Sequence, residues 1–298
     1  MRVSANQRRD CSQRVCPDFV AIARCAIMAR VPELDRRAAL RLGLAAAAAA
    51  ALRPGLASAA PAAPTYVDGT FVSAARGGIP TNWAIARPPG QTTPLRPVIA
   101  LHGKGQDAAG VMAGGVERGL AEAVDAGLPP FAVVAVDGGG SYWHRRASGE
   151  DSGAMVLDEL LPLLAEQGLD TSRVGFLGWS MGGYGALLLG ARLGPARTAA
   201  ICAVSPALWT SAGATAPGAF DGPEDYAANS VWGLPALGEI PLRIDCGTDD
   251  PFYAATKQFI AQLPTPPAGG FSPGGHNAAF WSSQLPAEIA WMAPLLTA

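Results

Sequence analysis

The distribution of apolar and polar positions predicts an α/β domain over residues 61–298. From Thr65 onward, short continuous apolar runs alternate with longer stretches of helical character. A run without polar alternation is typical of a strand buried on both faces of a parallel sheet. We expect strands at 70–73, 82–87, 98–101, 131–136, 174–177, 199–204 and 242–245, and helices at 111–126, 153–164, 184–189, 253–263 and one that contains 289–296. This order predicts a mostly parallel central sheet with helices on both faces, opened by two antiparallel strands.

Two segments interrupt this alternation. Residues 206–240 form a long connection rich in Gly, Pro, Ala and Trp, and long connections inside compact domains are usually functional. Residues 137–143 form a glycine-rich loop that lacks the spacing of a phosphate or dinucleotide site. Trp143, Trp209 and Trp232 are the candidate substrate-pocket residues of these segments, with buried packing as the alternative.

The charge balance excludes several kinds of partner. The chain has 298 residues, a formal net charge of −2 and a large apolar fraction. It has no Lys/Arg stripe in its main body, so we expect neither a nucleic acid nor an anionic membrane surface as a partner.

The first 60 residues predict an export signal instead of a folded part of the domain. Arg36-Arg37 is followed by an apolar, alanine-rich run and by the small-residue cleavage site Ala57-Ser58-Ala59. This resembles a twin-arginine signal, which implies the twin-arginine export machinery as a partner and a secreted or periplasmic location. A membrane anchor is the alternative, but the apolar run is shorter than the ~20 residues that span a bilayer. Met28 begins a segment of ordinary signal length, so we predict it as the true start.

The cysteines predict no metal site. Cys11, Cys16 and Cys25 precede the predicted start, and no fourth ligand follows them at a zinc-site spacing. Cys202 and Cys246 lie in predicted neighbouring strands, where buried free thiols are favoured over a disulfide.

The most informative motif is Gly178-Trp179-Ser180-Met181-Gly182, between a predicted strand and a predicted helix. Gly-x-Ser-x-Gly in this setting is the nucleophile elbow, a sharp turn that exposes the serine hydroxyl above the sheet. Side chains at the two flanking positions would collide with the strand and the helix, which explains both glycines. Ser180 is therefore the candidate nucleophile.

A serine hydroxyl needs a base, and the chain has three histidines: His102, His144 and His276. In this type of sheet the chain order is serine, acid, histidine, so the base must follow Ser180. Only His276 does. We expect His102 to pack and hydrogen bond beneath its loop.

The acid is expected after the strand at 242–245. Asp250 is our choice because of its Gly-x-x-Asp-Pro context, with Asp249 as the alternative and Asp245 as a weak third candidate. It would fix the histidine tautomer and stabilise the imidazolium ion. The backbone N–H groups of Met181 and Lys104 are the candidate oxyanion donors, since they follow the elbow strand and the first buried parallel strand.

These motifs resemble the putative esterase family of α/β-hydrolases, over nearly all of the chain that follows the signal. The resemblance rests on the segments 178–186, 137–143, 157–162, 246–252 and 274–281. That family includes esterase D-type S-formylglutathione hydrolases, feruloyl and acetylxylan esterases, and mycolyltransferases. The resemblance implies an α/β-hydrolase fold and an acyl-enzyme on Ser180. The chain departs from the family by having no carbohydrate-binding module and no long lid, so neither polysaccharide nor lipid specialisation is expected.

We therefore expect an exported serine carboxylesterase that hydrolyses small or medium acyl esters, with no metal or organic cofactor. An acyltransferase with the same triad is the nearest alternative, because transfer differs from hydrolysis only in the nucleophile that enters deacylation. A non-catalytic secreted binding protein of the same fold is a third. The export signal disfavours a cytosolic thioester hydrolase.

Overall fold

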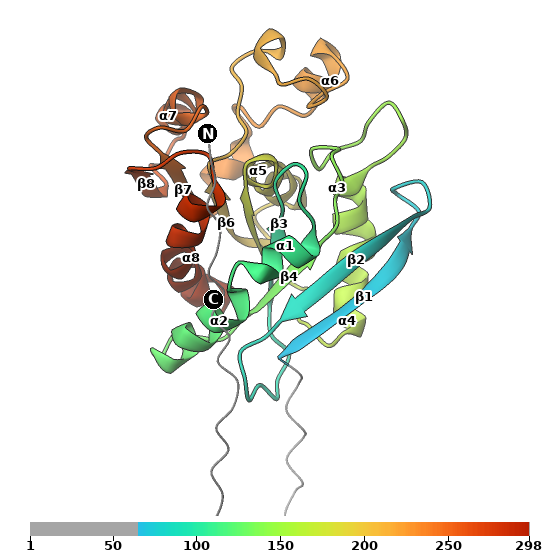
Figure 1. The fold of residues 1–298 in the computed structure, drawn as a ribbon, viewed down its shortest axis with the longest axis vertical. Helices are drawn as coiled ribbons and strands as arrows, with labels where there is room; N and C mark the ends of the chain where they lie inside the picture. Colours follow the sequence, from blue (N-terminus) through green and yellow to red (C-terminus); the bar gives the residue numbers. More distant parts are fainter. Residues whose placement is uncertain (1–64, 298) are drawn as a thin grey trace, which may run out of the picture. The chain divides into compact units, whose positions relative to one another are not determined.

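The computed structural model of the chain describes residues 65–297, which lie within one compact unit (Figure 1). Eight strands in this part form one sheet in the order β1-β2-β4-β3-β5-β6-β7-β8. The strands are β1 (Tyr66–Ser73), β2 (Ile79–Ala86), β3 (Pro97–Leu101), β4 (Ala132–Val136), β5 (Val174–Trp179), β6 (Thr198–Val204), β7 (Leu242–Gly247) and β8 (Ala268–Ser272). β1 and β2 pair antiparallel, as do β2 and β4, and all the remaining pairs are parallel. The predicted α/β class and the mostly parallel sheet are confirmed.

The central strands are buried because helices cover both faces of the sheet. Every residue of β3, β4 and β6 is buried, as expected for apolar runs without alternation. β8 was not predicted. Its sequence, Ala-Gly-Gly-Phe-Ser, contains two glycines with positive φ and lacks the β-branched residues that signal a strand.

One face of the sheet packs against the helices α1, α2 and α8, and the other packs mainly against α5 and the helical segment before β5. The helices are α1 (Ala108–Ala113), α2 (Val116–Asp125), α3 (Ser152–Ala154), α4 (Leu161–Glu166), α5 (Met181–Leu193), α6 (Pro223–Ala228), α7 (Tyr253–Gln262) and α8 (Ala278–Met292), with a π-helical turn η1 (Met155–Leu160) and the 3-10 turns η2 (Ala212–Ala214), η3 (Pro235–Gly238) and η4 (Ala293–Leu296). The single helix predicted at 111–126 is wrong. Gly115, at φ 92°, separates two shorter helices.

The strand order fixes where a site can form. β3 lies between β4 and β5 in the sheet. The next strand after β3, β4, is therefore placed on one side of it, and the following strand, β5, is placed on the opposite side. In open parallel sheets, ligands bind outside the carboxyl ends of the strands at such a switch point. The loops that follow β3 and β5 carry Lys104 and Ser180, so both candidate groups meet at this edge.

Several sequence predictions concern residues outside the described part. The twin-arginine-like signal, the start at Met28, the boundary at residue 61 and the three early cysteines all lie there. Between residues 65 and 297, no helix is long and apolar enough to cross a membrane. Cys202 and Cys246 are buried free thiols, as favoured from the sequence.

Candidate active site

The turn around Ser180 has the strained backbone expected of a nucleophile elbow. Ser180 has φ 57° and ψ −121°, a conformation that residues other than glycine rarely adopt. A Cβ atom at Gly178 would lie 2.3 Å from the carbonyl oxygen of Gly182, and one at Gly182 would lie 1.8 Å from the carbonyl oxygen of Leu101. The two glycines therefore allow the elbow to pack directly on β5 and β3, and α5 begins at the next residue, Met181.

Ser180, His276 and Asp250 form a continuous hydrogen-bonded chain. His276 Nε2 lies 2.8 Å from Ser180 Oγ, and His276 Nδ1 lies 2.8 Å from Asp250 Oδ2. The serine follows β5, the aspartate follows β7, and the histidine lies between β8 and α8, so three parallel strands position the three groups. The structure brings together the three residues that the sequence analysis selected.

The immediate surroundings of Asp250 are suited to a carboxylate. Its side chain is buried, and Oδ1 accepts a hydrogen bond of 2.8 Å from the Phe252 backbone N–H. Burial raises the pKa of Asp250, but the hydrogen bonds from His276 and Phe252 outweigh it, so the pKa lies below its usual value. The buried Ser205 hydroxyl also lowers this pKa, although its geometry falls short of a hydrogen bond.

Neither alternative acid has this geometry. Asp249 is exposed, and its backbone N–H donates to Gly274 O at 2.9 Å. Asp245 pairs with Arg243, whose Nε lies 2.6 Å from Oδ2. The contact to His276 belongs to Asp250 alone among the three.

The hydrogen-bond partners assign the His276 tautomer. The ionised Asp250 accepts only, so Nδ1 carries the proton and Nε2 is left to accept from the Ser180 hydroxyl. An imidazole in this state can remove the serine proton, while the aspartate stabilises the positive charge that results.

The loop after β3 is a tight turn that holds a second candidate oxyanion donor. Gln106 N–H donates to Gly103 O at 3.1 Å, and Gly105 at the third position has φ 79°, as in a type II turn. Lys104 occupies the second position, so its N–H takes no part in the turn hydrogen bond. Met181 N–H, in the first turn of α5, has no carbonyl partner within the helix.

Gln106, which the sequence analysis missed, links this turn to the elbow through hydrogen bonds. Its Oε1 accepts from Gly103 N–H at 3.2 Å and from Trp179 Nε1 at 2.5 Å. The only sequence signal was its place in the loop that carries Lys104. His102 has the supporting role predicted for it: it is buried, and its Nε2 accepts from Gly138 N–H at 2.9 Å.

A row of aromatic rings leads away from the triad. Phe252 lies edge-on to His276, with ring centroids 5.2 Å apart, and Trp209 lies 5.4 Å from Phe252. Tyr142 follows at 5.9 Å from Trp209, and Lys104 Nζ stands 5.6 Å from the Tyr142 ring centroid. Trp209 was predicted as a pocket residue and is part of this row, whereas Phe252 and Tyr142 were missed.

The prediction that Trp143 lines a substrate pocket is wrong. Its side chain is fully buried, 5.1 Å from the His102 ring, and it fills space that Gly138 and Gly185 leave free. The indole therefore supports the elbow helix from inside the core.

Trp232 is in contact with the backbone of Trp209. Its Nε1 donates to Trp209 O at 2.9 Å, and its ring packs edge-on against Phe259. Its assignment to a substrate pocket stays a prediction.

Within residues 65–297, one group of side chains is close enough to share a metal ion. Cys202 Sγ and carboxylate oxygens of Asp245 and Glu288 lie within 4.8 Å of one another, and all three residues are buried. Both oxygens of Asp245 already accept from Arg243, at 2.6 and 3.1 Å. The group contains none of the triad residues.

Several solved structures share this fold. A ferulic acid esterase aligns with a TM-score of 0.66 at 19% identity, over 77% of this chain and 98% of its own. An S-formylglutathione hydrolase from Agrobacterium tumefaciens aligns with a TM-score of 0.62 at 21% identity, over 78% and 95%. MPT51 from Mycobacterium tuberculosis aligns with a TM-score of 0.61 at 18% identity, over 79% and 100%. At these identities the likeness shows the α/β-hydrolase fold.

Sequence comparison identifies the family. No curated protein sequence gives a significant match to the chain. The profile of the family described as "Putative esterase" matches residues 78–292, which include the elbow, the acid and the histidine. The chain therefore belongs to the putative esterase family, as an esterase or related hydrolase of the α/β-hydrolase fold.

Proposed function

We propose that the protein is a serine carboxylesterase that hydrolyses small or medium acyl esters through an acyl-enzyme on Ser180. The observation that carries this proposal is the pair of 2.8 Å contacts that link Ser180 to His276 and His276 to Asp250. The ends of β5, β7 and β8, at one edge of the sheet, hold the three groups in place, so the nucleophile, base and orienting acid need no rearrangement before reaction.

Acylation begins when Ser180 Oγ attacks the ester carbonyl carbon while its proton moves to His276 Nε2. The negative charge that forms on the carbonyl oxygen accepts hydrogen bonds from the N–H groups of Met181 and Lys104, each worth ~3 kcal/mol of barrier. The intermediate collapses when the bond to the alcohol oxygen breaks, and His276 returns the proton to that oxygen.

Deacylation repeats these steps with water as the nucleophile. His276 takes a proton from water, the hydroxide oxygen attacks the acyl carbon, and the acid leaves as Ser180 recovers its proton. An alcohol in place of water would give a new ester, so the ratio of the two products distinguishes hydrolase from acyltransferase.

The aromatic row supports the size range of the proposed substrates. Phe252, Trp209 and Tyr142 offer flat apolar surfaces beside the triad, suited to a short aliphatic or aromatic acyl group. The paired arginines and the alanine-rich run before the domain support export as the setting for this activity.

The test combines a covalent probe with an ester assay. A fluorophosphonate should label the wild-type protein and not Ser180→Ala, and only the wild type should hydrolyse p-nitrophenyl acetate. Equal thermal unfolding of the two proteins controls for folding. Turnover retained by Ser180→Ala would reject the assigned nucleophile. Esters of graded acyl length and an added alcohol acceptor then define the substrate and the reaction.

A further inference from the structure

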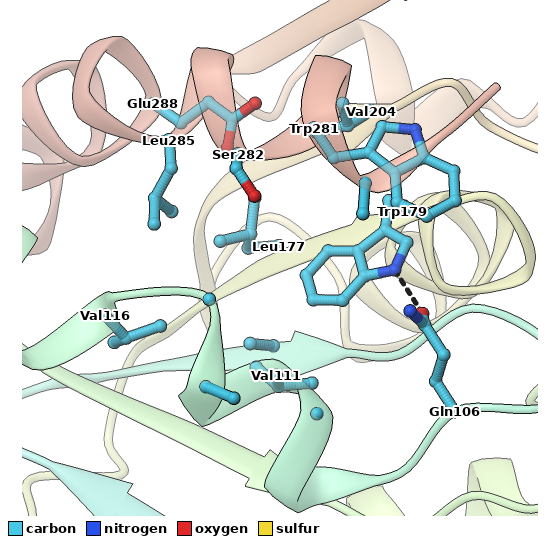
Figure 2. Close-up of a pocket in the computed structure, with 15 residues that line it drawn as sticks. Gln106, Val111, Val116, Leu177, Trp179, Val204, Trp281, Ser282, Leu285 and Glu288 are labelled. Carbon is cyan, nitrogen blue, oxygen red and sulfur yellow. Dashed lines mark hydrogen bonds between the residues drawn. The ribbon is translucent and has the colours of Figure 1, made fainter. Parts of the chain in front are cut away.

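A cavity of about 280 Å³ lies between α1–α2 and α8, on the face of the sheet opposite α5 (Figure 2). Its walls are largely apolar, and none of Ser180, Asp250 and His276 lines it. The bulky apolar side chains around it are Val111, Val116, Leu177, Trp179, Trp281 and Leu285. The indoles of Trp179 and Trp281 stack with centroids 6.1 Å apart at one end. This volume and lining are those of a site for a small apolar ligand.

Among residues 65–297, Glu288 is the only titratable side chain that lines this cavity. It is 2% exposed, and its Oε1 is buried without a hydrogen-bond partner. A buried carboxyl oxygen without a partner costs free energy, which a polar ligand can recover. An apolar cavity with one such acid at its wall suits a ligand that is mostly apolar and carries a single polar group able to pair with the Glu288 carboxyl.

The charged side chains around Glu288 indicate that the polar group of the ligand is a cation. Asp245 and Arg243 on β7 and Cys202 on β6 are its charged or titratable neighbours. Arg243 pairs with Asp245 at 2.6 Å, so its positive charge is already matched. In the described part of the chain, no basic side chain lines the cavity itself. The faces of the tryptophans at the end of the cavity away from Glu288 also attract cations (Figure 2).

We propose that this cavity binds a small molecule with an apolar body and a protonated amine, the body lying among the apolar walls and the amine pairing with Glu288. The site is separate from the triad and independent of the proposed esterase activity. It adjoins the catalytic machinery at Trp179, the neighbour of Ser180, and at Trp281, whose ring lies edge-on to His276 with centroids 5.1 Å apart.

The test is calorimetric titration of the Ser180→Ala protein with 4-phenylbutylamine and, as a matched neutral probe, 4-phenylbutan-1-ol. At pH 8 the amine should bind at least about tenfold more tightly than the alcohol, because only the amine forms an ion pair. Glu288→Gln should remove that preference and leave the affinity for the alcohol within about threefold. Because Ser180 is absent, these results do not depend on whether the protein is an esterase.

Two exposed positions on α8 provide a matched pair of variants. Ser282 lines the cavity, so Ser282→Phe should obstruct it and weaken amine binding at least about tenfold. Ala287 is exposed and does not line it, so Ala287→Phe should leave binding unchanged. Comparing these two variants tests whether the amine binds in this cavity, even if Glu288→Gln does not fold.

The pH dependence gives an independent readout. Burial raises the pKa of Glu288 to about 8, so at pH 7 amine binding should release close to one proton, and affinity should rise from pH 6 to 8. Equal affinity for amine and alcohol, binding insensitive to Glu288→Gln, or binding unaffected by Ser282→Phe would each overturn the proposal.

Discussion

Gly182 packs so closely on Leu101 that a Cβ atom at residue 182 would stand 1.8 Å from the Leu101 carbonyl oxygen. Both partners are backbone, so no side chain can move to relieve the contact. Gly182→Ala must separate the elbow from β3, and we expect a loss of about 3 kcal/mol or more in the free energy of unfolding. Urea unfolding measures this loss. Gly213→Ala is the control: among the described residues, no atom beyond the adjoining backbone lies within 4 Å of the added Cβ, so its effect should be small.

Asp250→Asn should impair catalysis far more than Asp249→Asn. Asn at 250 can donate its amide N–H to Nδ1, which places the imidazole proton on Nε2 and so fixes the wrong histidine tautomer, and the neutral amide cannot balance the imidazolium charge. We expect kcat to fall by ~10³ to 10⁴ for Asp250→Asn and by less than about threefold for the exposed Asp249→Asn. Steady-state kinetics on p-nitrophenyl acetate make the comparison. The reverse ranking would assign the acid to Asp249.

The parts of the fold that the sequence predicted are those encoded locally. The strands at 98–101 and 131–136 are continuous apolar runs, and both are buried as expected. The elbow is a five-residue motif, Gly178 to Gly182, between a strand and a helix. The order serine, acid, histidine then restricts the base to a single histidine, His276, because His102 and His144 precede the serine.

The missed features depend on contacts between distant residues. The burial of Trp143 follows from the absence of side chains at Gly138 and Gly185, which no local pattern reveals. Gln106 owes its role to the Trp179 indole, which is far from it in the sequence. β8 is held by pairing with β7 in spite of its glycines, so tertiary context overrides strand propensity there.

The turn after β3 allows the Lys104 N–H to be removed without changing the loop. Proline is favoured at the second position of a type II turn, and Lys104 occupies that position between Gly103 and Gly105. Lys104→Pro should lower kcat ~10²-fold or more if this N–H donates to the oxyanion. Lys104→Ala keeps the N–H and should change kcat by less than about threefold. Equal kcat values for the two variants would exclude Lys104 as a donor.

Glu288 should make the protein less stable as the pH rises. Burial, with a smaller contribution from Asp245, raises its pKa to about 8 from 4.5. Above pH ~4.5 the unfolded chain releases this proton and the folded protein keeps it, so the group destabilises the fold by ~1.4 kcal/mol per pH unit, levelling off above pH ~8. Glu288→Gln removes the titration. Urea unfolding of both proteins at pH 5 and pH 8 should show the wild type losing up to about 4 kcal/mol relative to the variant. Parallel stability curves would mean that Glu288 titrates as an ordinary carboxyl group.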